Sequence, residues 1–109
     1  LAGARFLFAE RPLALDEKAR KVMAEGGAAA LGAMLPVLDA EPDWRAPVLE
    51  AAIKFHAEKE GLKLGKLAQP LRAALTGATV SPGIFDVLEV LGREESLARL
   101  RDCVEERSA

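Results

Sequence analysis

One helical stretch places a cation among small polar side chains, at a spacing that could bind an anionic ligand or the edge of a base. Gly65, Gln69, Arg72 and Thr76 recur at offsets of 4, 7 and 11 residues, so they lie on one face of a helix. Arginine carries a planar fork of donors that can form two hydrogen bonds to a base edge or stack on the base. The pattern favours recognition of an anion or a base, and a surface arginine paired with a nearby acid is the alternative.

The start of the next helix adds further donors close by in the sequence. Gly77 is suited to end the first helix, and Ser81 and Pro82 are suited to the N-cap and the first position of the next one. The amides at a helix start attract anions. We therefore expect the guanidinium of Arg72 and the start of this helix to face a common hollow that is open to solvent.

The sequence lacks the residue sets of the common catalytic and metal sites. His56 is the only histidine, and its neighbours Phe55 and Ala57 favour a packed helical position. Cys103 is the only cysteine, which excludes an internal disulfide and fits a reducing compartment. One histidine and one cysteine cannot form a zinc site, and no glycine-rich phosphate loop follows a strand. We expect no catalytic residue, metal or cofactor in this segment.

The charge of the chain is low but unevenly distributed. The net charge of −2 argues against a surface coated with basic residues for general nucleic-acid binding. Residues 59–85 nevertheless contain Lys59, Lys63, Lys66 and Arg72 against the single acid Glu60. A small RNA footprint needs such a local cluster, but an ordinary solvated lysine face would carry it equally well.

The composition is that of a folded globular chain. With 109 residues, of which 50% are hydrophobic and 29% charged, we expect one small domain or two closely packed helical subdomains. No apolar run approaches the roughly 20 residues of a membrane span, and Arg5 interrupts the apolar start, which argues against a signal peptide. We expect a cytoplasmic protein with no membrane contact. Because an apolar helix is already under way at Leu1, we interpret the chain as a piece of a longer protein.

Helical periodicity runs through the chain, and no alternating strand pattern persists. We expect an all-α fold, a compact multi-helix bundle of about six helices. The predicted helices cover residues 16–25, 28–38, 44–60, 64–76, 82–91 and 94–106, after the end of an earlier helix over residues 1–8. The expected N-caps include Asp16 and Asp43, and the expected stops are Gly26-Gly27, Gly61, Gly77 and Gly92.

Some positions inside these helices carry expectations of their own. Pro70 is expected to break the helical pattern, so that an upstream carbonyl loses its helical partner. Trp44 is expected to anchor the start of its helix in the core. Arg99 follows Glu95 by four residues, the spacing of a solvated ion pair on a helix surface.

Four segments resemble one protein family. Residues 63–72 (KLGKLAQPLR), 74–77 (ALTG), 81–85 (SPGIF) and 92–99 (GREESLAR) resemble the C-terminal anticodon-binding domain of bacterial glutamate–tRNA ligases. The resemblance covers the last half of the chain, and before Trp44 it rests on helix spacing alone. It implies the helical anticodon-binding fold of class I tRNA synthetases. Residues 1–43 would end an upstream subdomain, and residues 44–109 would form the C-terminal subdomain.

The resemblance also implies that this segment is a non-catalytic part of an enzyme. In the parent, a separate nucleotide-binding domain would join glutamate to its tRNA with ATP and Mg²⁺, through an adenylate. The segment would splay out and read anticodon bases, without a cofactor of its own. Its partners would be the anticodon loop of glutamate tRNA and the catalytic domain of the same chain, in a monomeric enzyme.

The resemblance assigns roles to individual residues. The arginine of the family's QPLR motif contacts the anticodon, which gives that role to Arg72. Ser81, Pro82 and Ile84 stand where related enzymes hold unstacked anticodon bases, so the first and middle bases are assigned to Arg72 and this turn. The reader of the third base would lie upstream of Leu1.

Further residues fall into two groups. Gln69 and Thr76 share the face of Arg72 and are candidates either for the same pocket or for bonds to the backbone. Lys63 and Lys66 are expected to contact phosphates rather than bases. The alternative function is a helical protein–protein interaction module, in which the apolar faces of residues 64–75 and 84–91 dock a partner helix.

Overall fold

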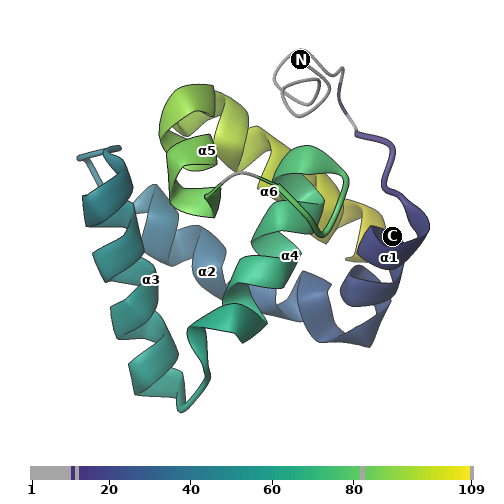
Figure 1. The fold of residues 1–109 in the computed structure, drawn as a ribbon, viewed down its shortest axis with the longest axis horizontal. Helices are drawn as coiled ribbons and strands as arrows, with labels where there is room; N and C mark the ends of the chain where they lie inside the picture. The colour runs from purple at the N-terminus through teal and green to yellow at the C-terminus, as the bar shows by residue number, and fades with distance from the viewer. Residues whose placement is uncertain (1–10, 12, 82, 109) are drawn as a thin grey trace.

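The computed structural model describes residues 11, 13–81 and 83–108 and confirms the all-α prediction for them. Their helices are α1 (Glu17–Val22), α2 (Ala28–Asp39), α3 (Ala46–Glu60), α4 (Leu64–Thr76), α5 (Ile84–Leu91) and α6 (Arg93–Ser108), with a kinked turn over Met23–Gly27 between the first two (Figure 1). The expected helix over residues 1–8 lies outside the described residues.

The first two helices form one apolar stretch with a break in it. As predicted, the side chain of Asp16 caps α1 by accepting from the amide of Ala19 at 2.8 Å, and Gly26 breaks the helix with a φ of 105°. By length and composition alone, the 23 residues of Glu17–Asp39 could cross a membrane, which the sequence analysis did not expect. The kink at Gly26 and the burial of Leu31 in the core make this stretch two packed helices of the fold.

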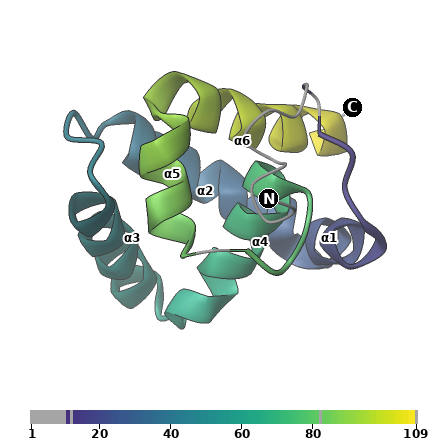
Figure 2. The ribbon, with the colours of Figure 1, turned by 45° about the horizontal axis from the view of Figure 1, so that its top comes forward.

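Helix α4 lies in the middle of the molecule and packs against every other helix. Figures 1 and 2 show α1 on one side of it and α3 on the other. The buried residues of α4 are Leu67, Ala68, Pro70, Leu71, Ala73, Ala74 and Leu75. Pro70 therefore sits inside a continuous helix with its ring in the core, which confirms the predicted helix over residues 64–76. The expected break is limited to the hydrogen bond that Pro70 cannot donate. The leucine faces proposed to dock a partner helix are the core of this domain, which removes the surface that the alternative function requires.

The glycine stops agree with the prediction. Gly61 and Gly77 end α3 and α4 in the left-handed conformation, with φ of 69° and 81°, and Gly92 ends α5 with a φ of 85°. Glycine adopts this conformation without the steric cost that a Cβ would bring.

The helix starts differ from the prediction at α3 and α5. The N-cap of α3 is Arg45, not Asp43, because the Asp43 carboxylate accepts hydrogen bonds from the Arg45 guanidinium instead. The first amide of α3, that of Ala46, donates to Glu89 Oε1 at 2.6 Å. The N-cap of α5 is Gly83, without a side-chain cap, so the prediction of Ser81 as the cap was wrong. Pro82 lies outside the described residues.

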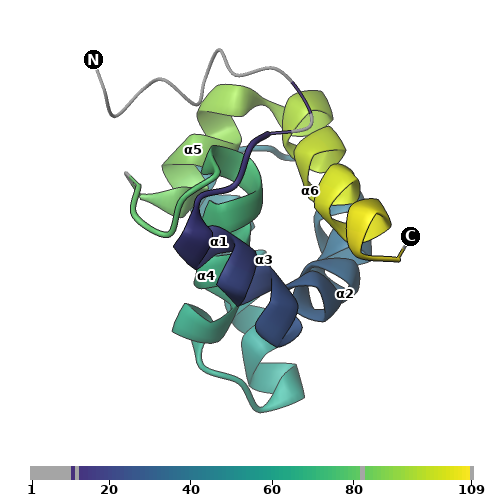
Figure 3. The ribbon, with the colours of Figure 1, turned by 90° about the vertical axis from the view of Figure 1, so that its right-hand side faces the viewer.

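One apolar core joins the two halves of the chain. It includes Leu31 and Met34 from α2 together with Ile53 from α3 and Leu100 from α6. Figure 3 shows α2 and α6 at one side of the molecule, where they pack together. Trp44 anchors the start of α3 as expected, because its indole N–H donates to the carbonyl of Leu88 at 2.8 Å. The division at residues 43 and 44 into two subdomains stays a prediction.

Candidate nucleic-acid interface

The outer face of α4 carries the polar stripe that the sequence predicted. Gly65 and Gln69 are exposed, and Arg72 and Thr76 are half-buried. The guanidinium of Arg72 forms no hydrogen bond or ion pair with the residues that the structure describes. The acid partner that would have made Arg72 a structural residue is therefore missing from this part of the chain, and its donors are available to a ligand.

Thr76 is committed to the backbone rather than to a pocket. Its hydroxyl donates to the carbonyl of Arg72 at 2.7 Å and accepts from the amide of Ala78 at 3.2 Å. These bonds shape the last turn of α4 and the loop after it. Thr76 was a candidate either for the pocket of Arg72 or for a bond to the backbone, and the structure shows the bond to the backbone.

The turn after α4 is fixed against the segment that leads into α1. The amide of Asp16 donates to the carbonyl of Gly77 at 2.8 Å. A Cβ on Gly77 would lie 2.7 Å from the carbonyl oxygen of Ala14, which is too close for any side chain. The loop toward α5 therefore leaves α4 from a position that two elements hold in place.

At the start of α5, the assigned side chains have little accessible surface. The side chain of Ile84 is only 2% exposed and has little surface on which a base could pack. The first amides of any α-helix lack partners within the helix. Ser81 is half-buried and already has an interaction partner.

Lys63, Lys66 and Gln69 come together along a hollow of about 610 Å³. Its other wall is the kink between α1 and α2, with Glu25 and Gly26. Lys63 and Lys66 are exposed and have no ion pair with any described residue. Neither Arg72 nor Ser81 lines this hollow, so the expected common hollow of Arg72 and the start of α5 stays a prediction.

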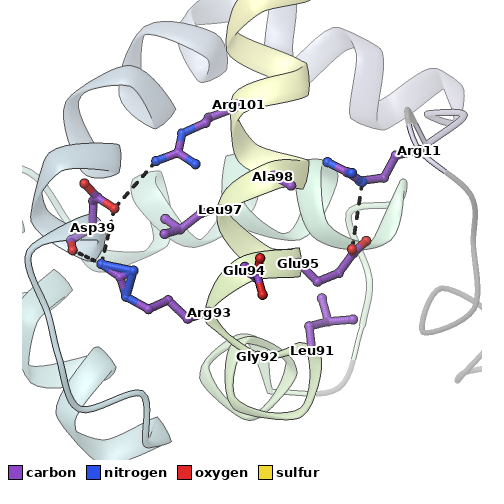
Figure 4. A pocket seen from close by; sticks show the side chains of 10 residues that line it. All are labelled: Arg11, Asp39, Leu91, Gly92, Arg93, Glu94, Glu95, Leu97, Ala98 and Arg101. Atoms are coloured by element: carbon purple, nitrogen blue, oxygen red, sulfur yellow. Dashed lines mark hydrogen bonds and ion pairs between the residues drawn. The ribbon is translucent and has the colours of Figure 1, made fainter.

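A second hollow, of about 960 Å³, lies where the end of α2 meets the start of α6. Figure 4 shows how its cations are neutralised. Arg93 and Arg101 both contact the Asp39 carboxylate, at 3.2 and 3.5 Å, and Arg11 lies 3.8 Å from Glu95. Arg93 also donates to the main-chain carbonyl of Asp39. These arginines tie helices together, in contrast to Arg72.

Arg99 has a structural role that its position in the sequence did not indicate. Its side chain is 1% exposed. It donates to Glu95 at 2.7 Å, as the helix spacing indicated, and also to the carbonyl of Leu75 at 2.7 Å. That carbonyl is one of the last four of α4, which have no partner within the helix. A buried cation on α6 therefore holds the end of α4 from the core side.

Comparison with known proteins gives one consistent result. A family model described as an anticodon binding domain matches residues 1–104. The chain is 65% identical over 100 residues to glutamate–tRNA ligase 2 of Brucella ovis and to glutamate–tRNA ligase 1 of Brucella melitensis, covering 92% of this chain and 21% of each relative.

Solved structures agree with the sequence matches. A crystal structure of a glutamate tRNA ligase from Elizabethkingia meningosepticum, in complex with its amino acid, has a TM-score of 0.83 at 30% identity and covers 94% of this chain and 20% of that chain. The glutamate–tRNA synthetase of Elizabethkingia anophelis has a TM-score of 0.70 at 31% identity, covering 93% and 19%. The chain thus spans about a fifth of the length of these relatives. Because the match covers nearly all of its residues, the chain belongs to the family of anticodon-binding domains.

Proposed function

We propose that this chain is the anticodon-recognition part of a glutamate–tRNA ligase. The observation that carries the proposal is Arg72, a half-exposed arginine on the outer face of α4 that has no partner among the described residues. Its donors suit a base edge or a base plane. The relatives that are 65% identical bear the name of that ligase, which indicates the RNA that this arginine meets.

Each part of the proposed site has a physical task. Arg72 contacts one unstacked anticodon base, and the turn of Ser81, Pro82 and Ile84 holds the next through amides at the start of α5. The bonds of Thr76 fix the start of the loop that leads from α4 to this turn. The domain would fix the tRNA so that its acceptor end reaches the catalytic domain.

The chemistry takes place elsewhere in the parent. Its catalytic domain would use ATP and Mg²⁺ to join glutamate to the tRNA, and the described residues contain no cluster of metal ligands. We propose a cytoplasmic, monomeric enzyme without membrane contact, in which residues 1–43 close an upstream helical subdomain and residues 44–109 form the C-terminal one.

The test is a binding titration at fixed salt with the anticodon hairpin of glutamate tRNA. Arg72→Ala should weaken binding by about 1–3 kcal/mol, and the effect should shrink on hairpins with a substituted first or middle anticodon base. Arg45→Ala is the matched control, because Arg45 is exposed and paired with Asp43. Equal affinities for wild type and Arg72→Ala, or equal losses in the two variants, would reject the role of Arg72.

A further inference from the structure

Of the residues assigned to the anticodon bases, Gln69 lines the hollow at the start of α4, whereas Arg72, Ser81 and Ile84 do not. The hollow has the chemistry of a nucleotide site. Its lining includes two apolar side chains with surface to offer, the half-buried Val22 and the exposed Leu62. Two cations, Lys63 and Lys66, line it against a single carboxylate, that of Glu25. An apolar wall next to unpaired cations suits a ligand that has both a flat face and a phosphate.

Gly65 leaves the hollow open, and Pro70 and Gln69 add polar groups to its lining. A Cβ added at Gly65 would meet no neighbouring atom within 4 Å, so bare backbone faces free space there. Pro70 also lines the hollow and has no N–H, which leaves the carbonyl of Lys66 without its usual helical donor. Gln69, exposed on the same wall, adds an amide that can donate and accept.

The hollow continues the stripe that carries Arg72. Gly65 and Gln69 line the hollow, and they share one helix face with Arg72. Gly65 and Arg72 are seven residues apart, which corresponds to about 10 Å along the helix axis. A single strand that meets Arg72 can follow α4 into the hollow without leaving this face.

We propose that this hollow binds a nucleotide that flanks the anticodon on the same RNA strand. Its phosphate lies at Lys63 and Lys66, its base packs on the wall of Val22 and Leu62, and its base edge meets Gln69. The inference rests on the proposed function, because it needs the RNA strand that Arg72 engages. It adds a contact outside the anticodon triplet.

A blocking substitution tests the site directly. Gly65→Leu should project an apolar side chain into the hollow and weaken binding of the anticodon hairpin about tenfold, without loss of the fold. Gly32→Leu is the matched control, because a Cβ at Gly32 also meets no atom within 4 Å and Gly32 lies outside the hollow. Thermal unfolding of both variants checks that they fold. An unchanged affinity of Gly65→Leu would overturn the inference.

A second variant acts in the opposite direction and guards against misfolding. Glu25→Gln removes the carboxylate of the hollow and should tighten hairpin binding about twofold to fivefold at low salt, which a damaged fold cannot do. Glu58→Gln, an exposed acid of α3 outside the hollow, should leave the affinity unchanged. Unchanged affinity of Glu25→Gln, or an equal gain in Glu58→Gln, would overturn the inference.

Hairpins with single abasic positions locate the bound nucleotide. One abasic position beside the triplet should weaken binding to the wild type but have no further effect on Gly65→Leu, because both changes remove the same contact. Coupling found only within the triplet would overturn the inference while leaving the proposed function intact. If the wild type binds no hairpin at all, the proposed function fails first, and the inference fails with it.

Discussion

Helix α4 has an arginine on each of its two sides, and the surroundings of these residues differ completely. On the core side, Arg99 of α6 is 1% exposed and donates to Glu95 and to the carbonyl of Leu75. On the outer side, Arg72 is half-buried and has no partner among the described residues. The acceptors around an arginine, not its residue type, decide whether its donors stabilise the fold or remain available to a ligand.

The hollow in Figure 4 supports the same distinction. Arg93 and Arg101 share Asp39, so both of these cations already have an acid partner within the fold. At the start of α4, Lys63 and Lys66 have no such partner in the part of the chain that the structure describes. A chain with a net charge of −2 thus has both paired cations, as in the hollow of Figure 4, and unpaired ones, as at the start of α4.

The largest effect should come from removing the inner arginine. Arg99→Ala should lower the free energy of unfolding by about 2–4 kcal/mol, because it leaves the buried carbonyl of Leu75 without a donor and opens a cavity. Arg72→Ala should change the same quantity by less than about 0.5 kcal/mol, because Arg72 has no partner to lose. Urea unfolding followed by circular dichroism measures both.

Arg99→Lys sharpens this comparison. Lysine keeps the charge but lacks the fork that reaches Glu95 and Leu75 at once, so it should recover only part of the stability. Equal unfolding free energies for Arg99→Ala and Arg72→Ala would contradict the division of the two arginines into an inner structural one and an outer binding one.

The second prediction compares two glycines that end helices in the same conformation. Gly61→Ala and Gly77→Ala both place a Cβ at a positive φ, which costs about 1–2 kcal/mol. A Cβ at Gly61 meets open space, whereas at Gly77 it lies 2.7 Å from the carbonyl oxygen of Ala14. Gly77→Ala should therefore cost about 1–3 kcal/mol more than Gly61→Ala. Equal midpoints of urea unfolding would mean that the turn after α4 is not fixed against residue 14.

The glycine stops could be predicted from the sequence, whereas the starts of α3 and α5 could not. A stop at Gly61 or Gly77 depends on the conformation of that residue alone, so the glycine reveals it. The start of α3 depends on Glu89, which accepts from the amide of Ala46 across 43 residues of sequence. No local pattern near Asp43 contains that partner, and the Asp43 carboxylate is itself taken up by the Arg45 guanidinium.

The candidate site also has a part that could be predicted from the sequence and a part that could not. The stripe of Gln69 and Arg72 follows from helical spacing and could be predicted. The hollow at the start of α4 could not, because its other wall is the kink at Gly26, tens of residues earlier in the chain. The burial of Arg99 could not either, since its second acceptor is the carbonyl of Leu75, 24 residues away.

The third prediction concerns the exposed lysines at the start of α4, and the expected effect is smaller. Lys63→Gln and Lys66→Gln should each reduce the slope of log affinity for the hairpin against log salt by about 0.7, the value for one lost phosphate contact on a single strand. Lys54→Gln is the control, because Lys54 is paired with Glu50 at 3.3 Å. A slope that stays the same in both variants would mean that these lysines do not contact phosphates.

The smallest effect should come from an exposed pair, that of Asp43 and Arg45. The hydrogen bond from the Arg45 side chain lowers the pKa of the Asp43 carboxyl, so the ionised form favours the folded state. This contribution is present above the pKa of an unfolded aspartate, near 4, and is lost as the pH falls through the lowered value.

Solvent and salt screen both charges of this pair. Asp43→Asn should therefore lower the melting temperature only slightly at neutral pH. The difference from wild type should vanish once the pH has fallen through the lowered pKa of Asp43 and in about 1 M salt, conditions that neutralise or screen the carboxylate. A difference at neutral pH as large as that of Arg99→Ala would show that burial does not separate the structural arginines of this domain from the exposed ones.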